Sequence, residues 1–171
     1  MTLTSPDQAE CAKFDVKYTC ACGTMNAGIT CTGSVGANGN NPELNWDNVP
    51  DGTKSFALTF LDTTQLDANQ AGMANHWAMW NIPAAARKFP RLSKTTLTGD
   101  LMGAKQTGMG GFFEPCPGGT DKYEFALYAL STDTLAVTGT NPGVMAIRDA
   151  LKMVTPLAVA TLHGTTGAGG K

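Results

Sequence analysis

The sequence has few charged residues. Aspartate, glutamate, lysine and arginine make up 15% of its 171 residues, and the net charge is −2. Globular proteins usually carry about a quarter of such residues. The chain therefore lacks the basic excess that binds nucleic acid, and no nucleic-acid partner is expected. Its apolar runs fall short of the ~18 residues that a spanning helix needs, so no membrane span is expected.

Signals for targeting and catalysis are also missing. The residues after Met1 are polar and include no apolar segment of the kind that a signal peptide needs. If the protein is exported, we expect its leader to have been removed ahead of this sequence. There is no Gly-x-Ser-x-Gly motif, and the glycines of Leu101–Gly111 lack the strand-to-helix context of a phosphate loop. No cofactor is expected.

The five cysteines are unevenly distributed, and four lie within 21 residues: Cys11, Cys20, Cys22 and Cys31. Cys20 and Cys22 are too close to pair with each other, so each is expected to pair outward. Two patterns stay open, Cys11–Cys20 with Cys22–Cys31, or Cys11–Cys22 with Cys20–Cys31. Free thiols and zinc are the rivals, although paired zinc ligands usually have about two to four residues between them.

Disulfides of this kind are typical of oxidising compartments, so we predict a secreted or periplasmic protein. Cys116, which two prolines flank, is left over and is expected to be a small buried thiol. We expect residues 1–40 to pack on or extend a main domain of residues 41–164. Residues 165–171 are expected to form a flexible tail.

Apolar patterns predict a mainly β protein. Ser55–Leu61 and Trp77–Ile82 are apolar on both faces, which is typical of central strands. Lys122–Leu130 and the stretch from Phe14 to Cys20 alternate between apolar and polar residues and predict two more strands.

Helices are expected at the periphery. One is predicted after Asn141-Pro142, with Asn141 as its cap and a buried stripe at Val144, Ile147, Leu151 and Val154. Leu157–Leu162 is predicted to form a short second helix. Surface loops are predicted for the remaining linkers, Thr63–Asn75, Ala84–Gly99 and Leu101–Gly111.

Two polar residues stand next to the predicted central strands. Asp62 follows the first strand and His76 precedes the second, with 13 residues between them. If these strands are neighbours, the carboxylate and the imidazole meet at one end of the core. A carboxylate there can orient or charge an imidazole, or help to hold a polar ligand. A purely structural Asp–His hydrogen bond is the alternative.

Several short motifs, taken in this order, resemble the phosphatidylethanolamine-binding protein family in its bacterial branch. They are Asn41–Trp46, His76-Trp77 with Asn81-Ile82-Pro83, Pro115-Cys116-Pro117, and Tyr123–Leu130. The resemblance covers residues 41–164. It implies a β-rich α+β fold in which a large antiparallel sheet packs on a smaller sheet, with peripheral helices. It also implies a small pocket at one end of the sheet, which takes phosphate-like groups.

Carried over position by position, the resemblance assigns a ligand site to Asp62, His76, Pro115, Pro117 and Tyr123, with Phe112, Phe113, Glu114 and Asp121 beside them. The chain departs from the family at several of these positions. Asp121 replaces a histidine, Glu114 replaces a glycine, and Asp62 keeps only the first acid of an Asp-Pro-Asp motif. Added acids repel a phosphate, so a neutral, amine-bearing or metal ligand is easier to accommodate. No metal-ligand spacing supports a dedicated metal site.

Three functions stay open at this point. The prediction is an extracytoplasmic module that binds a small molecule in a largely apolar pocket with a few polar groups. The first alternative is an enzyme in which Asp62 and His76 transfer a proton, in a hydrolysis or a ring closure. The second is a protein-interaction or inhibitor role. A homodimer is also left open.

Overall fold

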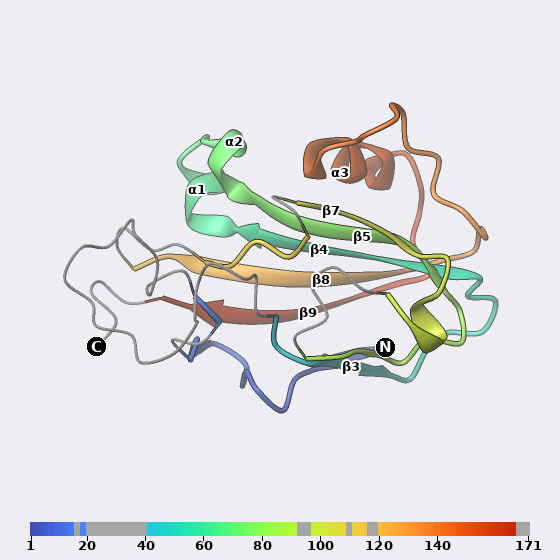
Figure 1. Ribbon diagram of the computed structural model, residues 1–171, viewed down its shortest axis with the longest axis horizontal. Coiled ribbons are helices and arrows are strands. Elements are labelled where there is room, and N and C mark those ends of the chain that lie inside the picture. The colour runs from blue at the N-terminus through green and yellow to red at the C-terminus, as the bar shows by residue number, and fades with distance from the viewer. Residues whose placement is uncertain (16–17, 20–40, 92–96, 109–110, 116–119, 167–171) are drawn as a thin grey trace.

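The structure is a computed structural model, and it describes all residues except 16–17, 20–40, 92–96, 109–110, 116–119 and 167–171. The described residues form two β-sheets with short peripheral helices (Figure 1). This confirms the predicted β-rich fold. None of the helices in these ranges has the length and the apolar character that crossing a membrane would require.

Among the described residues, the large sheet has six strands in the order β2-β9-β8-β4-β5-β7. Neighbouring strands are antiparallel except β2 and β9, which are parallel. The strands are β2 (Ala12–Lys13), β4 (Ser55–Asp62), β5 (Asn75–Pro83), β7 (Lys105–Gly108), β8 (Lys122–Leu130) and β9 (Ala158–Thr165).

A smaller sheet lies against one face of the large sheet, with the order β1-β3-β6. Its strands are β1 (Thr2–Thr4), β3 (Leu44–Asp47) and β6 (Lys88–Phe89). The helices are α1 (Thr63–Asp67), α2 (Ala71–Ala74), α3 (Val144–Lys152) and the 3₁₀ turn η3 (Gly99–Leu101). Figure 1 shows α3 on the opposite side of the large sheet from β3, so the sheet is covered on both faces.

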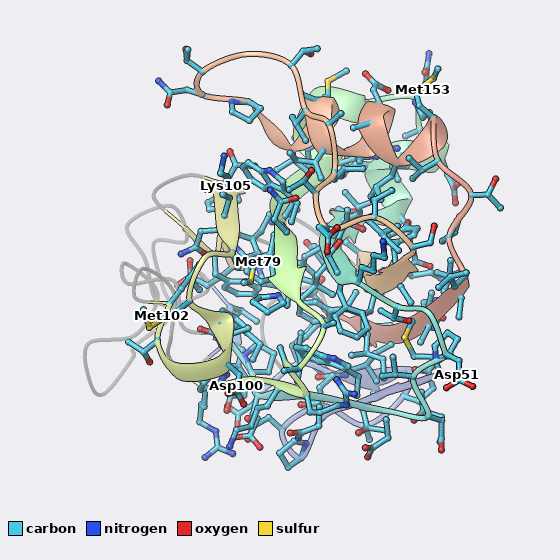
Figure 2. The ribbon with its side chains drawn as sticks, turned by 90° about the vertical axis from the view of Figure 1, so that its right-hand side faces the viewer. Asp51, Met79, Asp100, Met102, Lys105 and Met153 are labelled. Carbon is cyan, nitrogen blue, oxygen red and sulfur yellow. The ribbon has the colours of Figure 1, made fainter. Side chains whose placement is uncertain are left out.

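The two-sided apolar pattern of β4 explains this layering, because all eight of its residues are buried. Phe56 and Phe60 belong to the core toward the smaller sheet, where Trp46 lies 5.8 Å from Phe56 between ring centroids. Ala57 and Leu61 belong to the core under α3. Figure 2 shows Met79 inside the molecule, whereas Met102 and Met153 lie at its surface.

Several sequence predictions are wrong in ways that have a physical cause. Leu157–Leu162 is not helical, because alternate residues from Ala160 face the core, which is the period of a strand. The predicted loop Thr63–Asn75 contains α1 and α2, and Leu101–Gly111 contains the edge strand β7. The cap of α3 is Gly143 rather than Asn141.

The N-terminal strand prediction is also wrong for the described residues. Phe14 and Tyr18 are buried, yet neither lies in a strand, and only Ala12–Lys13 pairs with the large sheet. Cys11 is an exposed free thiol. Both predicted patterns pair Cys11, with either Cys20 or Cys22, and the structure shows no such bond at Cys11. Cys20, Cys22, Cys31 and Cys116 lie outside the described residues, so the disulfide pattern stays a prediction.

Candidate functional site

A β-bulge places His76. Phe60 of β4 pairs with Trp77 and Leu61 pairs with Asn75, so His76 is an extra residue without a partner on β4. In a regular strand His76 and Trp77 would face opposite sides of the sheet. The bulge turns both rings toward the core on the smaller sheet's side, where His76 contacts Phe60. Bulges often re-aim side chains at functional sites in this way.

His76 lies in an aromatic enclosure and is only 5% exposed. Its ring stacks on Phe113 at 5.0 Å between centroids and meets the rings of Phe60 and Tyr123 at 5.5 and 5.3 Å. Burial lowers the pKa of His76 to about 4, and the nearby carbonyls of Phe113 and Glu114 and the charge of Asp121 oppose this only in part. The imidazole is therefore neutral near pH 7.

The neutral ring has a defined tautomer. Its Nδ1 atom lies 3.2 Å from the carbonyl oxygen of Phe113. A carbonyl oxygen only accepts, so Nδ1 carries the proton and donates it. Nε2 then presents a lone pair and serves as an acceptor.

Two carboxylates lie near the phenol of Tyr123, which belongs to this enclosure. Asp62 at the end of β4 stands opposite Tyr123 of β8 in the sheet register. Burial and the charges of Asp62 and Asp121 raise the pKa of Tyr123, so its phenol keeps its proton. Burial, together with the charge of Asp62, also raises the pKa of Asp121, and His76 opposes this. The site therefore concentrates negative charge near a neutral imidazole.

Asp62 and His76 lie near each other without forming a hydrogen-bonded pair. Both side chains are at the same end of the sheet, but no hydrogen bond or ion pair joins them, and Tyr123 is near both. Asp62 instead accepts a hydrogen bond of 2.9 Å from the backbone N–H of Gln65 and caps α1. The structure thus joins Asp62 to α1 and His76 to the segment before residue 116, and not to each other.

The segment before residue 116 forms one wall of the site. Phe112 is buried and stacks on Phe60 at 5.2 Å, while Glu114 and Pro115 are also buried. Pro117 lies outside the described residues. A Cβ atom at Gly108 of β7 would collide with the carbonyl oxygen of Gly111 and lie 3.0 Å from that of His76. Glycine at position 108 therefore lets this wall approach the bulge.

The structure also tests which residues could hold a metal ion. The ligand atoms of Glu10, Cys11 and His163 lie within 4.8 Å of one another. Within the described part of the chain, Asp62, His76 and Asp121 do not form such a group, so the metal alternative at the sheet end is not supported. In the first cluster, Nδ1 of His163 is already bound to Oε1 of Glu10 at 2.6 Å.

Sequence reasoning missed the features that define this enclosure. Phe60 was assigned to the core only, although it contacts His76, and Thr166 was assigned to the tail. Thr166 is buried, and its N–H donates to the carbonyl oxygen of Asp121 at 2.9 Å. The alternation within β4 could have pointed to Phe60, but no residue pattern signals the bulge at His76.

Comparisons with known proteins agree with this fold. The sequence profile of the family described as phosphatidylethanolamine-binding protein matches residues 4–165. The UPF0098 protein YbcL of Escherichia coli (strain K12) is 38% identical over 127 residues, which are 70% of this chain and 66% of YbcL. A UPF0098 protein of Aquifex aeolicus is 34% identical over 119 residues, 66% of this chain and 64% of that protein.

Solved structures show the same architecture. The crystal structure of E. coli YbcL, described as a new member of the mammalian PEBP family, has a TM-score of 0.75 at 25% identity and covers 97% of each chain. A phosphatidylethanolamine-binding protein homologue from Chlamydia trachomatis has a TM-score of 0.68 at 21% identity, with 96% of this chain and 95% of that chain covered.

These matches assign the chain to a class of β-rich proteins. The chain belongs to the phosphatidylethanolamine-binding protein family, which confirms the resemblance found in the sequence. The matched region spans slightly less than two thirds of the two curated relatives named first, at 66% and 64% of their lengths.

Proposed function

We propose that this protein binds a small molecule at the sheet end around His76, and that the ligand presents an amine rather than a phosphate. One observation carries this proposal. The imidazole is held neutral by burial, with a pKa of about 4, while the charge of Asp121 acts on it from outside the aromatic enclosure. A neutral ring gives no charge attraction to an anion, and the neighbouring carboxylates repel one.

An amine fits the same surroundings. The carboxylates of Asp62 and Asp121 can pair with an ammonium group, and the face of an aromatic ring attracts a cation. The family is named for phosphatidylethanolamine, whose headgroup contains both a phosphate and an amine. In this chain the replacement of a family histidine by Asp121 favours the amine half.

Binding of ethanolamine and of inorganic phosphate to the purified protein tests this function by calorimetry. We expect ethanolamine to bind and phosphate not to bind. The variant Asp121→Asn should weaken ethanolamine binding about tenfold, because a charge-assisted contact is lost. Asp51→Asn removes the same charge from an exposed turn and is the matched control. Binding of phosphate without ethanolamine, or an equal loss in both variants, would contradict the proposal.

We also propose that the protein works outside the cytoplasm. The support is the cluster of four cysteines within 21 residues, of which Cys11 is exposed. Two disulfides would leave one of the five cysteines reactive in the denatured, unreduced protein. Counting thiols in protein purified from the native host tests this. Five reactive thiols would show that the cluster is reduced there and would remove the support for export.

A further inference from the structure

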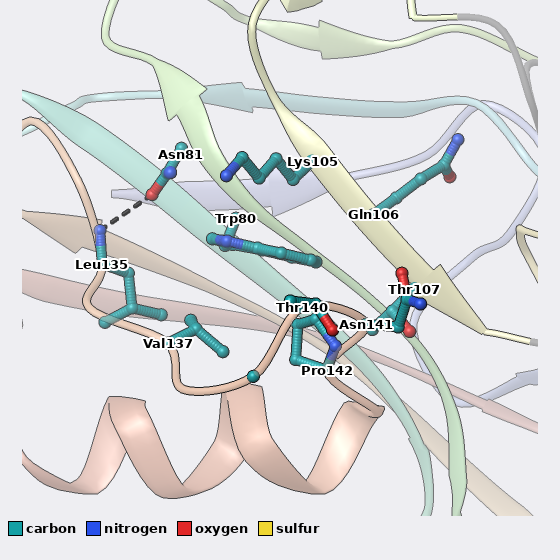
Figure 3. Close-up of a pocket in the computed structure, with 11 residues that line it drawn as sticks. Trp80, Asn81, Lys105, Gln106, Thr107, Leu135, Val137, Thr140, Asn141 and Pro142 are labelled. Carbon is teal, nitrogen blue, oxygen red and sulfur yellow. Dashed lines mark hydrogen bonds between the residues drawn. The ribbon is translucent and has the colours of Figure 1, made fainter.

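A cavity lies away from the His76 enclosure, between the edge of the large sheet and the loop that leads into α3 (Figure 3). Its volume is about 500 Å³, within the usual range for small-molecule sites. Trp80 of β5 and Lys105 of β7 are directly paired in the sheet, so their side chains lie next to each other on one face. Thr140 and Asn141 line the opposite wall.

The wall formed by the loop is fixed in position. Asn81 adopts a left-handed backbone conformation with φ of 54°. Its Oδ1 atom accepts a hydrogen bond of 2.8 Å from the backbone N–H of Leu135 (Figure 3). This bond joins the end of β5 to the start of the loop and fixes the loop at that point.

Trp80 carries an unused hydrogen-bond donor in this cavity. Its side chain is only 6% exposed, and its indole N–H bonds to none of the described residues. The neighbouring Trp77 differs, because its Nε1 atom donates to Oε1 of Gln106 at 3.1 Å. The indole nitrogen of Trp46 is unpaired and sealed from solvent. That of Trp80 is not sealed in this way. A mostly buried donor that remains reachable from the cavity indicates a place for a ligand acceptor.

The charge of the cavity is opposite to that of the His76 enclosure. Lys105 is exposed and forms no ion pair with a described residue. The lining contains no carboxylate, and its other polar side-chain groups are the amides of Asn81 and Asn141 and the hydroxyls of Thr107 and Thr140. The amide of Gln106 is bonded to Trp77 on the other face of the sheet. Such a lining supplies one fixed positive charge with several neutral donors and acceptors, which matches a small anion that also carries hydroxyl groups.

We propose that this cavity is a second binding site, which takes a small hydroxylated carboxylate such as a sugar acid. Lys105 pairs with the carboxylate of the ligand. The indole N–H of Trp80 and the surrounding amides bind its hydroxyl groups. The site is independent of the one around His76, since no residue is shared between the two.

Nuclear magnetic resonance of the full chain tests this site with gluconate as the probe and glucose as the neutral control. The chain has three tryptophans, and the variant Trp80→Phe assigns the indole N–H signal of Trp80 by removing it. We expect gluconate to shift that signal saturably and glucose to shift it at least tenfold more weakly. Lys105→Met should weaken gluconate binding about tenfold.

Lys88→Met is the matched control, because Lys88 is also exposed and also lies in the edge strand of a sheet. It should leave gluconate binding unchanged. An unmoved Trp80 signal at millimolar gluconate overturns the proposal. Equal responses to gluconate and glucose, or equal losses in Lys105→Met and Lys88→Met, overturn it as well.

Discussion

The large sheet holds the two histidines of the chain in two different regions. His76 on β5 is enclosed by the rings of Phe60, Phe113 and Tyr123. His163 on β9 is partly exposed, and its ring nitrogens lie 2.6 Å from Oε1 of Glu10 and 3.2 Å from Oε2 of Glu124.

The two regions show what decides the charge of an imidazole in this sheet. Burial among aromatic rings lowers the pKa of His76 to about 4. The hydrogen bond to Glu10, with a further contribution from Glu124, raises the pKa of His163 although partial burial opposes it. Acidic groups are near both histidines, so distance and solvent access, rather than the mere presence of a carboxylate, separate a neutral ring from a charged one.

The largest expected effect comes from removing the ring at the centre of the aromatic region. Phe60 stacks on Phe125 at 4.1 Å and contacts His76. We expect Phe60→Ala to lower the free energy of unfolding by about 3–5 kcal/mol, because it leaves a cavity in a packed core. Glu10→Gln changes the other region at an exposed ion pair and should cost less than ~1 kcal/mol. Chemical denaturation compares the two variants. Equal losses of unfolding free energy would contradict the distinction between the aromatic region and the exposed ion pair.

The next effect is a dependence of stability on pH that His76 creates. Its pKa is about 4 in the folded protein against 6.5 for a free histidine. Between these values the unfolded chain binds a proton that the folded chain does not, so stability falls as the pH drops from 6.5 toward 4 and is unaffected above that window. The loss amounts to about 3 kcal/mol.

The variant His76→Gln isolates this contribution, because glutamine does not titrate. The unfolding free energy of the natural protein should decline more steeply than that of the variant between pH 6.5 and pH 4. Parallel curves for the two proteins would show that His76 is not held neutral by the fold.

Gly108 is expected to have a smaller effect, again on the aromatic side. A side chain there would collide with the backbone at Gly111 and press on the carbonyl of His76. We expect Gly108→Ala to lower the free energy of unfolding by about 1–3 kcal/mol. Thermal or chemical unfolding measures this change. Gly72→Ala is the control, because a Cβ atom there meets nothing within 4 Å. A harmless Gly108→Ala would mean that the wall at Phe112 does not depend on this close approach.

The smallest effect is expected at His163. Its pKa is raised in the folded protein, so its contribution to stability is fully present below the pKa of the unfolded chain and is lost as the pH rises through the folded value. His163→Gln should therefore lower the free energy of unfolding by less than ~1 kcal/mol, because the pair is exposed. This loss should be present only at pH values below the folded pKa of His163. A loss in His163→Gln that grows with rising pH would contradict the assignment of the ion pairs.

Much of the fold could be predicted from the sequence, because apolar residues in β4, β5 and β8 follow the two-sided and alternating patterns that sheets require. The prediction of a helix over Leu157–Leu162 failed, since so short an apolar run does not separate a strand from a helix by its composition. The short helix α1 was missed because it buries no residue and depends on one capping bond from Asp62.

The candidate site could be predicted only in part. The structure brings Asp62, His76, Asp121 and Tyr123 to one end of the sheet, since each stands at a strand end or beside one. Their role in binding a ligand stays a prediction. The neutral state of His76 could not be predicted, because it depends on a bulge and on rings that come from three separate segments. The cavity at Trp80 and Lys105 could not be predicted from a sequence motif, because it arises from the pairing of two strands and the path of a loop.

The most direct test of this account is a titration of both histidine rings by nuclear magnetic resonance. With only two histidines in the chain, His76→Gln assigns both sets of signals. We expect His76 to stay neutral down to a pH of about 4, with its proton on Nδ1, while the pKa of His163 is raised above the ordinary 6.5. A His76 midpoint at or above that of His163 would show that the sheet end carries a charged imidazole and would contradict the proposed preference for an amine.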